Sequence, residues 1–106
     1  MKLWVALAGV GLLAAGNANA MSEADGLALA QKHACLTCHA IDHKIVGPAW
    51  KDVAAKYRGD KGAEARLIAK VKNGGAGSWG SIPMPPNSQV SDADIKALVK
   101  FTLSLK

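Results

Sequence analysis

Two cysteines and a histidine lie close together in the chain, at Cys35, Cys38 and His39. On a helical turn, side chains three and four residues apart share one face, so both thiols and the imidazole point to the same side. Cys-x-x-Cys-His is the attachment pattern of a c-type haem. The thiols form thioethers with the two vinyl groups of the porphyrin, and His39 binds the iron. The motif therefore predicts one covalent haem c, held by Cys35 and Cys38, with His39 as an axial ligand.

A Cys-x-x-Cys pair also occurs in thiol redox proteins and in zinc sites. A thioredoxin-like motif requires a surrounding βαβ pattern, and none is found around Cys35. A zinc site requires further Cys or His ligands at suitable spacing, and Cys35 and Cys38 are the only cysteines. In an exported chain this pair could also be oxidised to a disulfide, but haem attachment would consume both thiols. The residues favour haem over these alternatives.

Residues 1–20 have the organisation of a secretory signal peptide. One positive charge at Lys2 precedes an apolar run from Leu3 to Ala15, and Ala18-Asn19-Ala20 has the form of a cleavage site. The run is short for the ~30 Å hydrocarbon core of a bilayer, so we expect cleavage after Ala20. Because the positive region is a single lysine, an uncleaved membrane tether stays open as an alternative.

Residues 21–106 are enough for one small domain. Domains of this size usually need a cofactor, a metal or disulfides to be stable, so we expect the chain to be largely unfolded without haem. Removal of residues 1–20 takes away one lysine and lowers the net charge from +5 to +4. This charge is too small to indicate nucleic acid, and no basic run is interleaved with aromatics. It suits steering toward an acidic partner, or simply a solvated surface rich in lysine.

The pattern of apolar residues predicts an all-α fold of about four short helices, with no strand pattern and no internal repeat. The predicted helices span residues 22–33, 50–57 and 63–73, and a last one begins at Ser91. Ser22 and Ser91 are each followed three residues later by Asp, as in a capping box. Val90 and Ile95 stand where a hydrophobic staple would be. We expect the last helix to pack against the first.

Segment 74–90 is long for a loop in so small a domain, and loops of this length are usually functional or disordered. Within it, prolines precede and follow Met84 and restrict the backbone. The other two methionines leave with the signal peptide or become the amino terminus. A lone methionine is normally core filler, but the second face of a haem iron needs a ligand, and we predict Met84 as that ligand. Asn87, three residues on, is placed to donate a hydrogen bond to its sulfur.

A histidine that binds a metal usually has its second ring nitrogen held by a hydrogen bond. The carbonyl of Pro48 is a suitable acceptor for His39, because the proline makes the turn rigid. By its spacing Pro48 is equally suited to begin the following helix, and both roles are compatible. His33 and His43 flank the haem segment and cannot easily reach the opposite face of the haem. We expect both at the surface.

These motifs make the chain resemble the small bacterial class I cytochromes c of the c-551/c-552 type. The resemblance covers essentially all of residues 21–106. It rests on three stretches: Cys35-Leu-Thr-Cys-His39, Val46-Gly-Pro48-Ala-Trp50, and the loop that contains Trp79 and Ile82-Pro-Met84-Pro-Pro-Asn87. The first is shared by all c-type cytochromes, whereas the last is much more specific to this type.

The resemblance implies the small class I cytochrome c fold, wrapped around one haem, with a cytochrome c domain at 21–106. It also implies that Pro48 accepts a hydrogen bond from the proximal histidine and that Asn87 bonds the ligand methionine. Trp79 is expected to reach a haem propionate, as is a basic residue near Lys70.

The family consists of periplasmic one-electron carriers in respiratory chains, not enzymes. The resemblance therefore implies electron transfer from a partner such as a cytochrome bc complex to a nitrite reductase or terminal oxidase. Redox partners are expected to dock transiently at the exposed haem edge near Cys35 and Cys38. A monomer is expected, without stable membrane insertion once the signal is cleaved. An enzyme or gas sensor would instead need an open sixth position at the iron.

Overall fold

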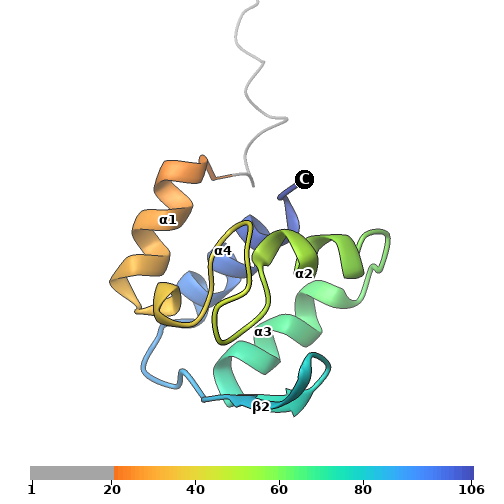
Figure 1. Cartoon of the computed structure of the whole chain (residues 1–106). Coiled ribbons are helices and arrows are strands. Elements are labelled where there is room, and N and C mark those ends of the chain that lie inside the picture. The colour runs from red at the N-terminus through yellow and green to blue at the C-terminus, as the bar shows by residue number, and fades with distance from the viewer. Residues whose placement is uncertain (1–20) are drawn as a thin grey trace, which may run out of the picture.

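Four α-helices build the part of the chain that the computed structural model describes, residues 21–106 (Figure 1). They are α1 (Glu23–Lys32), α2 (Trp50–Lys56), α3 (Ala63–Asn73) and α4 (Asp92–Leu103), and a single 3-10 turn, η2 (Cys35–Thr37), follows α1. The predicted all-α class is confirmed. None of these helices is both long and apolar enough to cross a membrane. The predicted signal peptide and its cleavage site lie outside the described residues.

The helices begin and end where local sequence predicts. The Ser22 hydroxyl accepts a hydrogen bond from the Asp25 backbone N–H at 3.1 Å, and Ser91 accepts one from Asp94 at 3.2 Å. Each bond satisfies one of the backbone donors that a helix start leaves without an intrahelical partner. At the end of α3, Gly74 adopts φ +76°, a value that favours glycine.

The core forms where α4 packs against the other three helices (Figure 1). Its buried side chains make two clusters, Ala30, Trp50, Val53, Leu98 and Phe101 in one, and Val90, Ile95 and Val99 in the other. The second cluster confirms the staple predicted between Val90 and Ile95. A Cβ atom at Gly26 of α1 would lie 2.4 Å from the Phe101 ring, so glycine is what lets α1 and α4 approach so closely.

The prediction that the chain contains no strands is wrong for segment 74–90. There β1 (Gly75–Gly77) pairs antiparallel with β2 (Gly80–Met84), with Gly75 opposite Met84 and Gly77 opposite Gly80. The φ angles of Gly75, Gly77 and Gly80 are +147°, +108° and +112°, a region that side-chain-bearing residues rarely adopt. The hairpin is therefore built on glycine conformations and not on alternating apolar side chains, which is why no strand pattern is visible.

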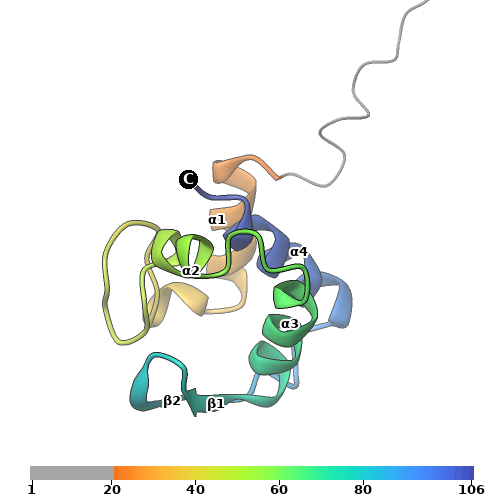
Figure 2. The same ribbon diagram turned by 90° about the vertical axis from the view of Figure 1, so that its right-hand side faces the viewer.

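The hairpin and the connection between η2 and α2 extend beyond the helices on the same side of the molecule, the left-hand side in Figure 2. The strand residues are exposed except Met84, which is half-buried. The two segments that carry the predicted axial ligands thus lie on one side of the helical body.

Candidate haem site

Cys35, Cys38 and His39 lie on and directly after the turn that follows α1. Ala34 adopts the left-handed conformation, with φ +63°, and so redirects the chain at the end of α1. The carbonyl of Cys35 then accepts hydrogen bonds from the backbone N–H groups of Cys38 and His39, at 3.2 and 3.1 Å. Both thiols are free and half-buried. The backbone therefore gathers the three residues of the motif on one tight turn.

The surroundings of Cys35 do not resemble those of a redox-active thiol. Burial raises the pKa of the Cys35 thiol, and this effect outweighs the hydrogen bond from its own backbone N–H, which lowers the pKa. In redox-active Cys-x-x-Cys motifs the pKa of the nucleophilic thiol is lowered, because the thiolate is the reactive form. The direction of this pKa shift is therefore opposite to the one that a reactive Cys-x-x-Cys thiol shows.

The imidazole of His39 is held in one tautomer. Its Nδ1 lies 2.9 Å from the carbonyl oxygen of Pro48, as predicted. Because a carbonyl oxygen only accepts, Nδ1 must carry the hydrogen and donate it. In the neutral ring the lone pair is then on Nε2, the arrangement that a metal-binding histidine needs.

Neighbouring residues restrict the position of the His39 ring. The ring stacks on Trp50 with a centroid distance of 5.5 Å and an interplanar angle of 27°. On the connection after the motif, the N–H of Gly47 donates to the carbonyl of Cys38 at 2.8 Å. A Cβ atom at Gly47 would lie only 2.5 Å from His39 Cε1. The absence of a side chain at this position therefore lets the connection pass directly beside the ring.

Met84 ends β2 and is attached to the end of α3. A Cβ atom at Gly74 would lie 2.6 Å from the Met84 carbonyl oxygen and 2.9 Å from the Pro86 nitrogen. Three residues after Met84, both the backbone N–H and the side-chain amide of Asn87 donate to the carbonyl of Val71, at 3.1 and 3.0 Å. The chain is thus held to the end of α3 at Met84 itself and at the three residues that follow it.

Asn87 and Trp79 have partners of a different kind from those predicted. The Asn87 amide also donates to the Pro85 carbonyl at 3.2 Å, and its contact with the Met84 sulfur stays a prediction. Trp79 lies at the hairpin turn, 42% exposed, with Lys56 Nζ 4.7 Å from the centre of its ring. Its contact with a propionate also stays a prediction. Lys56, from α2, was not predicted as a site residue, and nothing in its local sequence distinguishes it from the other lysines.

The residues present fit a haem. In the described part of the chain, the exposed large apolar side chains all lie on the two segments that carry His39 and Met84: Ile45 and Val46 on the connection, Trp79 and Ile82 on the hairpin. Exposed apolar groups gathered in this way indicate a binding surface. The donors are an imidazole of fixed tautomer, a thioether and two free thiols, and this set suits a covalently attached haem.

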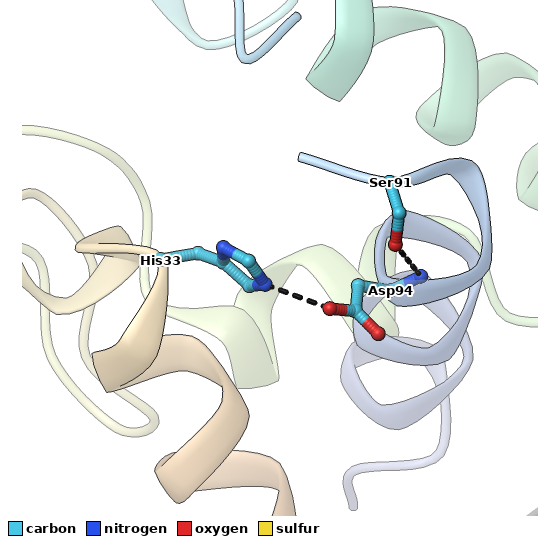
Figure 3. Close-up of polar contacts among 3 residues, drawn as sticks. All are labelled: His33, Ser91 and Asp94. Atoms are coloured by element: carbon cyan, nitrogen blue, oxygen red, sulfur yellow. Dashed lines mark hydrogen bonds and ion pairs between the residues drawn. The ribbon is translucent and has the colours of Figure 1, made fainter. Parts of the chain in front are cut away.

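His33 is half-buried and paired, and not the exposed surface residue that was expected. Its Nε2 lies 2.8 Å from Asp94 Oδ2, and its side chain is 16% exposed. Figure 3 shows the pair together with Ser91, which caps α4, the helix that contains Asp94. The partner is 61 residues away, so no local pattern reveals the contact. The pair joins the end of α1 to the start of α4. His43 is exposed, as expected, and contacts Asp42 at 3.0 Å.

Comparison with known proteins gives consistent matches. Residues 23–106 match the family model described as Cytochrome c. The chain is 62% identical to cytochrome c-551 of Allochromatium vinosum over 79 residues, which are 74% of this chain and 84% of that protein. It is 53% identical to cytochrome c-552 of Nitrosomonas europaea over 95 residues, 90% of this chain and 87% of that protein. The crystal structure of wild-type cytochrome c552 from Nitrosomonas europaea matches with a TM-score of 0.73 and 52% identity, covering 76% of this chain and 99% of that chain.

Proposed function

The chain belongs to the cytochrome c family, and from this premise we propose that it carries single electrons between respiratory redox proteins in the periplasm and is not an enzyme. The predicted class I cytochrome c fold is confirmed by the four helices and by the likeness to the cytochrome c552 structure. A small carrier of this kind needs two things from its chain, namely rigid attachment of the cofactor and a surface for transient contact with partners.

The proposed cofactor is one haem c, attached through Cys35 and Cys38 and axially bound by His39 and Met84. When bound, it supplies an iron centre that takes up and releases one electron. The observation that carries this proposal is the hydrogen bond from His39 Nδ1 to Pro48 at 2.9 Å. It leaves the Nε2 lone pair for the iron, on the same turn as two free thiols.

The chain's own residues hold this site in place. Pro48 fixes the tautomer of His39, and Trp50 stacks on its ring. The contacts with the end of α3 hold the backbone at Met84 and directly after it. With one protein ligand on each face, no position is open to a substrate, so the site suits outer-sphere electron transfer. Histidine–methionine ligation raises the reduction potential, and rigid ligands need little rearrangement between the oxidation states.

The finer assignments are part of the same proposal. Trp79 contacts a haem propionate, and Asn87 orients the Met84 sulfur. Residues 1–20 direct export and are removed after Ala20. A monomer then meets its partners at the haem edge near Cys35 and Cys38, where the positive net charge favours an acidic docking surface. The donor is a protein such as a cytochrome bc complex, and the acceptor is a nitrite reductase or a terminal oxidase.

The absorption spectrum of the purified mature protein, oxidised and reduced and extended into the near infrared, tests the proposal. We expect low-spin haem in both states and the weak near-infrared band of methionine sulfur bound to ferric iron. A high-spin ferric spectrum, or carbon monoxide binding to the ferrous form at neutral pH, would show an open sixth position and refute the carrier assignment.

A further inference from the structure

The position of the β1–β2 hairpin depends on a few attachments. Its residues are exposed, except for Met84. A two-stranded hairpin on its own is only marginally stable in water. Near the base of the hairpin, Asn87 and the close approach at Gly74 attach the chain to α3. These contacts hold the end near Met84 but not the turn at the opposite end.

The hairpin turn is attached to α2 by Lys56. Lys56 Nζ donates a hydrogen bond to the carbonyl of Ser78 at 3.0 Å and lies 4.7 Å from the centre of the Trp79 ring. Within residues 21–106, this is the one side-chain hydrogen bond between the helices and the turn between the strands. Lys56 is also the last residue of α2, where the helix dipole favours a positive charge.

Helix α2 therefore contacts both predicted ligand segments. Its first residue, Trp50, stacks on the His39 ring, and its last residue, Lys56, holds the hairpin that ends in Met84. Trp50 is buried and packs edge-to-face on Phe101 of α4, so the helix is firmly anchored in the core. One short helix thus links the turn of the hairpin to the His39 ring, while the base of the hairpin is held by α3.

We propose that Lys56 is a positioning residue for electron transfer, which holds the Ser78–Trp79 turn against α2 and so keeps Met84 bound to the iron. The inference rests on the proposed ligation by Met84. One exposed charged hydrogen bond and one exposed cation–π contact are each modest. Their loss should raise the fraction of molecules with a detached Met84 about tenfold, which corresponds to about 1.4 kcal/mol.

The test compares five forms of the haem-loaded ferric protein: wild type, Lys56→Gln, Lys56→Arg, Lys96→Gln and Met84→Ala. Lys96 is exposed on α4 and, within residues 21–106, makes no side-chain hydrogen bond or ion pair, so its variant controls for the loss of one charge. The first measurement is the rate of imidazole binding to the ferric iron at mildly alkaline pH, where the probe is mostly uncharged. The second is amide hydrogen exchange in the hairpin and in α4.

We expect Lys56→Gln to bind imidazole about tenfold faster than wild type and to exchange its hairpin amides faster by a similar factor, with exchange in α4 unchanged. Lys56→Arg should stay near the wild-type rate, because arginine also donates hydrogen bonds and lies over aromatic rings. Lys96→Gln should bind imidazole and exchange its hairpin amides at the wild-type rates.

The proposal is overturned if Lys56→Gln binds imidazole at the wild-type rate, if Lys96→Gln accelerates binding equally, or if exchange rises equally in α4. Failure of Met84 ligation itself looks different: wild type would then bind imidazole as fast as Met84→Ala. The two failures are therefore distinguishable in one set of measurements.

Discussion

Replacing Gly47 by alanine would place a methyl group against the proposed iron ligand. The added Cβ would lie 2.5 Å from His39 Cε1 and 3.0 Å from both ring nitrogens. Carbon atoms pack best at about 3.5–4.0 Å, so either the ring or the Gly47 backbone must move by about 1 Å. The ring is not free to move, because Pro48 holds Nδ1 and Trp50 stacks on one face.

The expected cost follows from these contacts. A shift of about 1 Å would stretch the 2.9 Å bond from His39 to Pro48 beyond hydrogen-bond range. Overpacking of this kind typically costs about 1–3 kcal/mol. Each kcal/mol lowers the Tm of a domain of this size by about 4–8 °C, so we expect the haem-loaded variant to melt about 5–20 °C lower. Because the hydrogen bond tunes the ligand, the reduction potential should shift as well.

Thermal unfolding and redox titration of the loaded protein measure both effects, with Gly62→Ala as the matched control. A Cβ atom at Gly62 would also meet a close neighbour, at 2.6 Å, but that atom is the end of the flexible Arg66 side chain. Gly62 has an ordinary φ of −91°, so the control should change the Tm by only a few degrees. If Gly47→Ala kept both the wild-type Tm and the wild-type potential, the view that Gly47 makes room for the ring would be wrong.

Four further predictions follow from other parts of the structure. Met84→Ala should lose the near-infrared band, lower the potential and bind exogenous ligands, and an unchanged potential would show that the ligand is wrongly assigned. Gly74→Ala should weaken the near-infrared band and lower the free energy of unfolding by about 1–3 kcal/mol, because its Cβ would press on the Met84 carbonyl. The control is Gly59→Ala, since Gly59 has a similar φ of +83° but no neighbour within 4 Å, so this variant measures the cost of the positive φ alone. Removing either side chain of the His33–Asp94 pair should lower the free energy of unfolding by about 1 kcal/mol. Removing both should lower it by little more, and urea unfolding of the wild type, the two single variants and the double variant measures this. The haem-free chain should be largely unfolded, so well-dispersed NMR signals from it would contradict the role of haem as part of the core.

Helix positions could be predicted because the signals for them are local. Ser22 and Ser91 cap the helices that they were expected to begin, since capping depends on residues only three apart. The hydrogen bond from His39 to Pro48 could be predicted for the same reason, because it spans nine residues across a turn that proline makes rigid. Such features depend little on how the rest of the chain packs.

The hairpin could not be predicted because its strands lack the usual signal. Alternating apolar residues mark a strand only when one face is buried, and here every strand residue but Met84 is exposed. The one available hint is the run Gly74, Gly75, Gly77 and Gly80, which permits positive φ at several positions. Glycine permits such a conformation but does not specify it, so pairing became visible only in the structure.

The contacts that could not be predicted at all join distant segments. His33 meets Asp94 across 61 residues, and Lys56 meets Ser78 across 22. In each case a polar side chain from one helix end reaches a segment that only helix packing brings near, and in the sequence both residues resemble ordinary surface groups. The proposed haem ligands could be predicted, because the chemistry of the cofactor restricts which residue types and spacings can bind it. Local sequence is therefore enough to propose which residues bind the haem, whereas the residues proposed to hold those ligands in position emerge only from the packed helices.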